Sequence, residues 1–350
     1  MTIIYFILIL GLIIMIHEFG HFICAKKAKI HVYEFSLGMG PRLFKWNRKN
    51  DETDYSIRLF PIGGYVSMAG EDVEVDEKVP VEKRLQSKTW LQRFSVVVAG
   101  VVMNFILAIV LLFIYGLVVG VDTNEAIMGK ISENSPLYNI GIEENDKIIK
   151  INGNNTKSLD MFLLEYQIAL TGDNVKFTIL KPNGEIKDYV AKPLEVKEMK
   201  KGKEEISYSF DFSLNNIEEK GILNHIKYAF KRFFSLMKQM FFTIIYLITG
   251  KLSLKNLAGP IGIYSIVGQA AKLGFINLVY LTALLSLNVG FINILPLPAF
   301  DGGRLFFMII EKIRRKPIKP EIENRIHSVG LILLLILMIV ICFNDITKLF

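Results

Sequence analysis

TIIYFILILGLIIMIHEFGHFICAKK, residues Thr2–Lys27, is the first apolar segment of the chain and the one from which its architecture follows. An uncharged run of about 20 residues is long enough to cross ~30 Å of hydrocarbon as a helix. Residues 3–25 meet that length, and His17, Glu18 and His21 are their only ionisable side chains apart from a tyrosine and a cysteine. Charged groups at membrane depth are costly and usually functional. The alternative is a motif at the membrane edge whose polar groups are simply solvated.

The residues His17–His21 form the pattern H-E-x-x-H. Side chains four residues apart lie on one face of a helix, so both imidazoles can reach a single ion. Neutral imidazole binds zinc at about 2.0–2.1 Å, and Glu18 is placed to take a proton from the attacking water. The pattern also occurs by chance in unrelated proteins, and its position inside an apolar helix is what favours a metal site here.

Three further apolar segments, residues 94–121, 275–295 and 329–343, predict a multi-pass membrane protein with four spans. The net charge of +7 could suggest nucleic acid, but most basic residues flank apolar segments, and no nucleic-acid-binding module is visible. The N-terminal run lacks the basic start and small-residue cleavage site of a signal peptide, so we expect it to be retained.

Basic residues near the segment ends predict the orientation. Lys26, Lys27 and Lys29 follow the first segment, and the loop 304–325 between the third and fourth is also basic. Both loops are therefore expected in the cytoplasm, with both termini and residues 122–274 outside. Residues 240–249 are apolar but too short to span, and the basic residues before them predict an amphipathic helix on the membrane surface.

Two regions predict β structure. Residues 55–60 and 65–68 flank a Pro-Ile-Gly-Gly turn at 61–64, which predicts a β-hairpin, while residues 71–77 predict an acidic loop. Residues 122–219 contain short strand-like runs and an Asn152-Gly153 turn, which predict a small α+β module. The predicted division is 1–121 for the first two spans and the hairpin, 122–219 for the module, 220–274 for the surface region and 275–350 for the last two spans.

Two histidines leave a catalytic zinc one protein ligand short, and no E-x-x-x-D pattern follows His21 closely. The candidate is Asp301, at the end of the third apolar segment, where Pro296 and Pro298 must end the helix. With four spans, His21 and Asp301 finish on the same side of the membrane; a fifth span at 240–249 would separate them. Asp301 taken alone could equally be an interfacial residue in a Gly-Gly turn.

Four motifs together resemble the site-2 protease family of intramembrane zinc metalloproteases, in its bacterial RseP and RasP type with a single PDZ domain. Residues 17–21 are similar to its first-helix H-E-x-x-H, and residues 293–303 to its N-x-x-P-x-P-x-L-D-G, with Phe300 where Leu is usual. Residues 98–104 are similar to its second-helix motif, with Val101 in place of a common Pro, and residues 61–66 to its membrane-associated hairpin. The resemblance implies a PDZ-like fold for the module.

The resemblance also implies a zinc site and a substrate site. These consist of His17, His21 and Asp301 as ligands of one Zn²⁺, Glu18 as general base, Asn293 at the substrate or the developing oxyanion, and Gly63, Gly64, Tyr65 and Pro298 as substrate contacts. Asn293 has an alternative role in satisfying backbone groups freed by the prolines. The hairpin either offers an edge strand to an unwound substrate or merely closes a cytoplasmic loop.

The expected function is hydrolysis within transmembrane segments of single-pass proteins, such as anti-sigma factors or remnant signal peptides, after an upstream site-1-type protease has trimmed them. The PDZ-like module either binds a cut C-terminus or excludes bulky substrates. The alternative is a non-catalytic membrane scaffold that recruits partners through that module. A transporter is disfavoured because paired broken segments are absent from the sequence.

Overall fold

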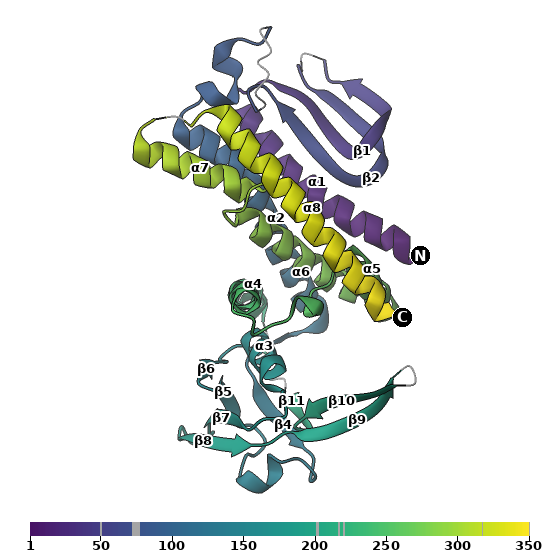
Figure 1. The fold of residues 1–350 in the computed structure, drawn as a ribbon, viewed down its shortest axis with the longest axis vertical. Helices are drawn as coiled ribbons and strands as arrows, with labels where there is room; N and C mark the ends of the chain where they lie inside the picture. Colours follow the sequence, from purple (N-terminus) through teal and green to yellow (C-terminus); the bar gives the residue numbers. More distant parts are fainter. Residues whose placement is uncertain are drawn as a thin grey trace. The chain divides into compact units, whose positions relative to one another are not determined.

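A computed structural model describes residues 1–49, 51–71, 78–200, 203–215, 218–219, 221–316 and 318–349 (Figure 1). Six residues of the predicted acidic loop, 72–77, lie outside these ranges. The chain forms two compact units, one of Met1–Leu111 with Lys255–Phe350 and one of Leu112–Leu254. Each unit is described by itself.

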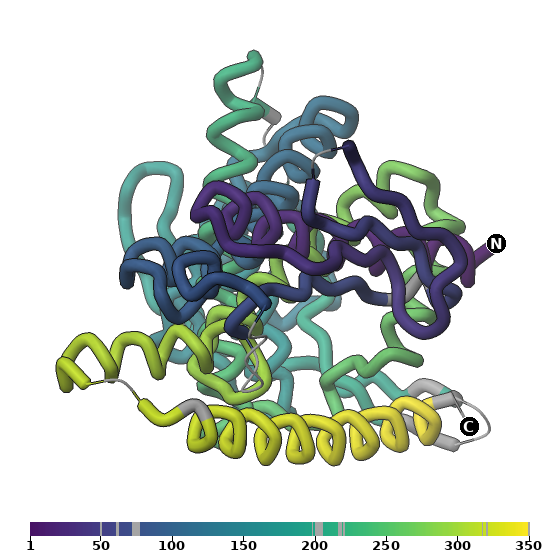
Figure 2. Tube along the Cα trace, turned by 90° about the horizontal axis from the view of Figure 1, so that it is seen from above, coloured from purple at the N-terminus to yellow at the C-terminus, as the bar shows by residue number. Residues whose placement is uncertain are grey.

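Among the described residues, four helices are long and apolar enough to cross a membrane, in agreement with the four predicted segments. They are α1 (Thr2–Lys27), α2 (Trp90–Val119), α6 (Phe275–Ile294) and α8 (Pro320–Leu349). The predicted segments fall within or close to these helices, and Figure 2 traces α8 as one long straight helix. The shorter helices of the first unit are α5 (Pro260–Lys272) and α7 (Asp301–Arg314), with single turns η1 (Val81–Lys83) and η2 (Leu85–Ser87). A further single turn, η4 (Leu254–Asn256), lies at the junction of the two units.

The predicted hairpin between residues 55–60 and 65–68 is wrong in its pairing. Both runs belong to one strand, β2 (Asp54–Met68), which pairs antiparallel with β1 (Val32–Asn47) through an irregular register. Ser36 has Cα partners in both halves of β2, Ser56 and Tyr65. Gly63, with φ of +94°, bends β2 within the segment predicted as a turn, since glycine adopts that backbone conformation without a steric penalty.

Strand β1 was not predicted because polar side chains lie on its buried face, the reverse of the usual pattern. Glu34 and Ser36 are buried, whereas the alternate residues Tyr33 and Phe35 are only half-buried. The alternation that indicates a half-buried strand assumes apolar side chains on the inner face. In β1 the inner face carries the Glu34 carboxylate, which neighbouring side chains hydrogen-bond, and the apolar face is partly exposed.

The second unit contains a sheet with strand order β11-β4-β5-β7-β8, and β6 pairs with β5. The elements of this sheet and its helix are β4 (Ile127–Ile131), β5 (Lys147–Ile151), β6 (Asn154–Asn155), α3 (Leu159–Ala169), β7 (Val175–Leu180), β8 (Ile186–Ala191) and β11 (Phe212–Asn215). Around it lie η3 (Tyr138–Ile140), the hairpin β9 (Leu194–Lys200) with β10 (Lys203–Ser209), and the pair β3 (Val121–Asp122) with β12 (Glu218–Glu219). Phe162, Phe177 and Phe210 are central to its apolar core.

Helix α4 (Ile222–Ile248) belongs to the second unit and packs against α3. Arg232 forms an ion pair of 3.1 Å with the buried Asp160, and the Tyr246 hydroxyl donates to Glu165 Oε1 at 2.6 Å. The predicted apolar run 240–249 is thus the end of one longer helix, and α4 is not among the candidate spans found in the described residues. The compact unit extends beyond the predicted module because α4 buries one face on it.

Candidate metal centre

Helix α1 places His17 and His21 on the face that packs into the first unit. That face also carries Ile9, Ile13, Gly20 and Ala25, all buried. The two imidazoles are about nine-tenths buried, and their Nε2 atoms lie 3.2 Å apart. The spacing of four residues therefore brings two metal-binding nitrogens together, as the sequence predicted.

Two glycines allow α1 and α2 to meet at this level. A Cβ on Gly20 would lie 2.4 Å from the carbonyl oxygen of Ala99, and a Cβ on Gly100 would lie 2.4 Å from His21 Nε2 and 2.8 Å from His17 Nε2. The two imidazole rings thus occupy space that only glycine leaves free at position 100. Small residues at helix crossings in membranes permit such close backbone approach.

Helix α2 also contacts the far side of each ring. His21 Nδ1 lies 2.7 Å from the Val96 carbonyl oxygen, to which it can only donate. His17 Nδ1 lies 3.2 Å from the side-chain nitrogen Nδ2 of Asn104, which is fully buried. The Oδ1 atom of Asn104 has no hydrogen-bond partner among the described residues. With the amide turned by 180°, Oδ1 takes the place of Nδ2 and accepts a hydrogen from Nδ1. The Ser286 hydroxyl of α6 donates to the backbone carbonyl oxygen of Asn104 at 2.8 Å. A hydrogen on Nδ1 leaves Nε2 with its lone pair, which is the state that binds metal.

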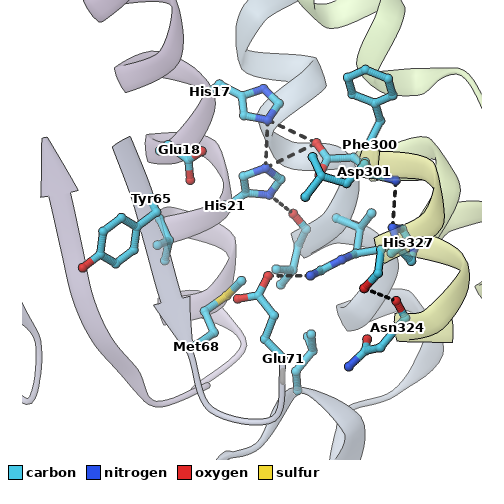
Figure 3. A pocket seen from close by; sticks show the side chains of 18 residues that line it. His17, Glu18, His21, Tyr65, Met68, Glu71, Phe300, Asp301, Asn324 and His327 are labelled. Atoms are coloured by element: carbon cyan, nitrogen blue, oxygen red, sulfur yellow. Dashed lines mark hydrogen bonds and ion pairs between the residues drawn. The ribbon is translucent and has the colours of Figure 1, made fainter. Parts of the chain in front are cut away.

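Asp301 reaches the histidines from a break between two helices. Helix α6 ends at Ile294, and α7 begins at Asp301. Two glycines after Asp301 make the turn possible, because a Cβ on Gly302 would lie 2.1 Å from the Leu295 carbonyl oxygen and one on Gly303 would lie 2.5 Å from that of Leu297. Asp301 Oδ2 lies 3.2 Å from His17 Nε2 and 3.4 Å from His21 Nε2 (Figure 3).

The three donor atoms fit a tetrahedral zinc ion. Ligands bound at about 2.0–2.1 Å in tetrahedral geometry are separated by roughly 3.3–3.4 Å, and the three observed separations are 3.2, 3.2 and 3.4 Å. Asp301 Oδ2 is buried and has no hydrogen-bond partner among the described residues, as expected for an atom reserved for a cation. Two imidazoles and one carboxylate leave a fourth position open, the arrangement of catalytic rather than structural zinc.

The donor atoms open onto a cavity of about 600 Å³. Glu18 lines it next to His17, and Tyr65, Val66 and Met68 line it from β2. Helices α7 and α8 close the opposite side with a polar group of side chains, Arg304, Asn324, His327 and Ser328 (Figure 3). Arg304 forms an ion pair with Glu71, which also lines the cavity.

The other predicted substrate contacts fall at different places. Gly64 lies beside the catalytic candidate, since a Cβ there would be 3.6 Å from Glu18 Cγ. Gly63 contacts Met39, and Pro298 contacts α8 at Gly330. Asn293 lies half-buried on the last turn of α6. Neither Asn293 nor Pro298 is among the described residues that line the cavity.

A charged network supports the cavity wall at Tyr65. Its hydroxyl donates to Glu34 Oε2 at 2.8 Å, and Arg42 and Arg58 donate to the same carboxylate at 2.8 and 2.9 Å. Burial opposes the charge on Glu34, but hydrogen bonds from Ser56, Tyr65 and the two arginines outweigh it and lower the pKa of Glu34 to about 2. Sequence reasoning missed this network because its members are distant in the chain.

Several other contributors were also missed. Gly100 and Asn104 lie within the second-helix motif, but the sequence assigned them no role. His327 gave no signal beyond being a histidine just before the fourth apolar segment. Their contacts depend on how α1, α2 and α8 pack, which spacing along one helix does not reveal.

The chain matches a family model described as "Peptidase family M50" over residues 5–337. It is 34% identical to the zinc metalloprotease RasP of Bacillus licheniformis, in an alignment covering 100% of this chain and 99% of the relative. It is 31% identical to the regulator of sigma-W protease RasP of Bacillus subtilis, with the same coverage. A zinc metalloprotease RasP of Oceanobacillus iheyensis is also 31% identical, again over 100% and 99%.

Proposed function

The chain belongs to peptidase family M50 and is a zinc metalloprotease, and we propose that it cuts single-pass membrane proteins within their transmembrane segments. The observation that carries the proposal is the triangle of His17, His21 and Asp301 beside Glu18, in a cavity between candidate membrane helices. A site among such helices would meet peptide bonds within the membrane, which supports this class of substrate.

His17, His21 and Asp301 are the proposed ligands of one zinc ion, and their separations support that assignment. The zinc, when bound, acidifies a water molecule and polarises the scissile carbonyl. The Val96 carbonyl holds one imidazole and the Asn104 amide the other, so that both Nε2 atoms point to the same place.

Glu18 is the proposed general base. It follows His17 directly on α1 and lines the cavity, which places its carboxylate within reach of water held in the cavity. It accepts a proton from the attacking water and delivers a proton to the leaving amine. Because Gly64 has no side chain, β2 approaches Glu18 closely and narrows the space around it.

The proposed substrate site is the edge of β2. A helical substrate hides its carbonyl groups in intrahelical hydrogen bonds and must unwind locally before hydrolysis. Tyr65, Val66 and Met68 line the cavity while pairing with β1 on their other side. An extended substrate could therefore add to this edge as a further strand. Asn293 and Pro298 remain proposed contacts through the family resemblance alone, and Asn293→Ala should raise KM if the first is right.

The proposed setting follows from the basic loops: a multi-pass protein of the cell membrane with its metal site toward the cytoplasm. We propose a PDZ-like fold for residues 122–219, supported by the main sheet and helix α3, on the extracytoplasmic side. We also propose a membrane-surface position for α4. One similar protein is called a regulator of sigma-W protease, which supports pre-trimmed proteins such as anti-sigma factors as the substrate class. An upstream site-1-type protease would trim them.

The test compares membrane proteomes of cells carrying wild-type protein with cells carrying Glu18→Gln. We expect trimmed single-pass proteins to accumulate in the variant, and purified Glu18→Gln to retain zinc while losing cleavage by a factor on the order of 10²–10⁴. Full cleavage by the variant would refute the mechanism. A chain that binds no stoichiometric zinc and leaves membrane proteins uncut would favour the alternative, a scaffold that recruits partners through the PDZ-like domain.

A further inference from the structure

His327 is a half-buried histidine that lines the cavity and that the hydrolytic steps do not use. It lies on α8, and its side chain is 17% exposed. It lines the same cavity as His17, His21 and Asp301 (Figure 3). Its two ring nitrogens have different surroundings, and these indicate a separate role for each nitrogen.

The Nδ1 atom of His327 holds the turn before Asp301. The backbone N–H of Ala299 donates to His327 Nδ1 at 3.0 Å. Ala299 has φ of +76°, a left-handed conformation that a residue with a Cβ adopts only at a cost. Asp301 follows two residues later. A hydrogen bond that holds the Ala299 peptide in place therefore also restricts where the Asp301 carboxylate lies relative to the histidines.

Helix α8 also fits closely around this turn. A Cβ on Gly330 would lie 2.4 Å from Pro298 Cβ and Cγ, and a Cβ on Gly303 would lie 3.2 Å from His327 Cε1. The ring of Phe307 on α7 lies 5.8 Å from that of His327, measured between centroids. The turn before Asp301 is thus enclosed by α7 and α8. This packing also holds the His327 ring, which accepts the hydrogen bond from Ala299, in place.

The Nε2 atom of His327 has no hydrogen-bond partner among the residues that the structure describes. Because Nδ1 accepts from Ala299, a neutral His327 carries its hydrogen on Nε2. Nε2 is buried and makes no hydrogen bond within the described residues. Glu323 Oε1 lies 4.0 Å away, beyond hydrogen-bond distance. A buried donor without an acceptor is unfavourable and calls for an explanation.

We propose that His327 serves the site from α8 with both nitrogens: Nδ1 positions Asp301 through the Ala299 peptide, and Nε2–H binds a backbone carbonyl of the substrate. The second half rests on the proposed function, because an unwound transmembrane segment brings carbonyl groups that have lost their helical partners. The first half concerns the protein alone and needs no substrate.

Two substitutions separate the halves. Asn matches the Nδ1 edge of histidine, so His327→Asn keeps an acceptor for Ala299 and removes the Nε2 donor. Gln reaches the position of Nε2, so His327→Gln keeps a donor there and removes the acceptor near Ala299. The full-length protein, purified in detergent, is tested for zinc affinity by competition with a chelator and for KM and kcat on a single-pass model substrate.

We expect His327→Asn to bind zinc within about threefold of wild type and to raise KM about tenfold. We expect His327→Gln to weaken zinc binding roughly 10- to 100-fold, as loss of support to a metal ligand does, with KM near wild type once zinc is saturating. Adding Ala299→Gly to His327→Gln should restore most of the zinc affinity, because glycine adopts the left-handed conformation without a Cβ penalty.

The two-sided role of His327 is overturned if the Asn and Gln variants shift the same quantity, or if Ala299→Gly restores nothing. A wild-type protein that binds zinc but cleaves no single-pass substrate overturns the proposed function instead. In that case the zinc affinities of the His327 and Ala299 variants still decide whether His327 positions Asp301.

Discussion

The metal site joins two kinds of structure. Helix α1 supplies His17 and His21 from regular backbone, where one turn sets their separation. Asp301 comes from the break between α6 and α7, where a left-handed Ala299 and two tightly packed glycines, Gly302 and Gly303, carry the chain to the same place. The helical half is built from local spacing, and the turn half is built from contacts among three helices.

This difference predicts different sensitivities. On α1 the two histidines have the right separation as soon as the helix forms. A substitution lowers zinc affinity there only if a neighbouring side chain displaces the imidazole rings. In the turn, a ligand is misplaced whenever its supports move, even when no atom touches the metal site. Variants on the two sides should therefore change zinc affinity by different amounts and for different reasons.

Gly100→Ala should have the largest effect. Its new Cβ would lie 2.4 Å from His21 Nε2 and 2.8 Å from His17 Nε2, so both ligands of the helical half must move. We expect zinc affinity to fall more than about 100-fold, beyond the range typical of a lost supporting contact, measured by competition with a chelator. Gly116→Ala is the matched control on α2, because its Cβ would also be crowded, 2.8 Å from Val121 Cγ1 and 3.3 Å from Tyr228 Cδ1, but away from the metal ligands. Stoichiometric zinc at wild-type affinity in Gly100→Ala would contradict the geometry.

Asp301→Ala should come next, because it removes one ligand and leaves the helical pair intact. We expect zinc affinity to fall by about 100-fold and cleavage to be lost at limiting zinc, with the helix content by circular dichroism unchanged. Asp301→Glu keeps the carboxylate but lengthens the side chain, and should retain part of the affinity. Unchanged zinc occupancy in Asp301→Ala would remove this residue from the proposed ligand set.

The same contrast explains how much the sequence predicted. The four spans and the shared face of His17 and His21 follow from segment length and helical spacing, and the structure agrees. Asp301 was reached by combining the chain's topology with a motif resemblance, and it lies within 3.4 Å of both histidines. Both inferences use information contained in single segments or in their order.

What was missed depends on packing between segments. The pairing of β1 with β2 was wrong because β1 buries a carboxylate, so its pattern of polarity does not mark a strand. Gly100, Asn104 and His327 act across helix interfaces, and nothing in their own helices shows which residue they face. A sequence pattern fixes the spacing along an element, while these contacts depend on the crossing of elements.

Asn104→Leu should have a smaller effect, confined to the support of one ligand. Leucine is similar in shape and removes the amide beside His17 Nδ1. When Nε2 binds metal, Nδ1 carries a hydrogen, and Asn104 Oδ1 accepts it once the amide is turned by 180°. We expect zinc affinity to fall roughly 10- to 100-fold, while Asn104→Asp, which keeps an acceptor, should bind zinc at least as tightly as wild type. Equal affinities in the two variants would show that the amide fills space without orienting the ring.

Glu34→Gln should have the smallest effect, because it alters the cavity wall and neither half of the metal site. The low pKa of Glu34, about 2 against a usual 4.5, means that the ionised carboxylate stabilises the fold above about pH 4.5 and that this contribution disappears as the pH falls toward 2. At pH 7 the variant should lose roughly 1–3 kcal/mol in unfolding of the metal-free protein, and the gap from wild type should narrow toward pH 3. Zinc affinity at pH 7 should stay within about twofold. A larger loss of zinc affinity would mean that the β1–β2 pair also supports the metal ligands, as we propose for α8. The part of the cavity that holds the ligands and the part proposed to bind substrate would then not be independent.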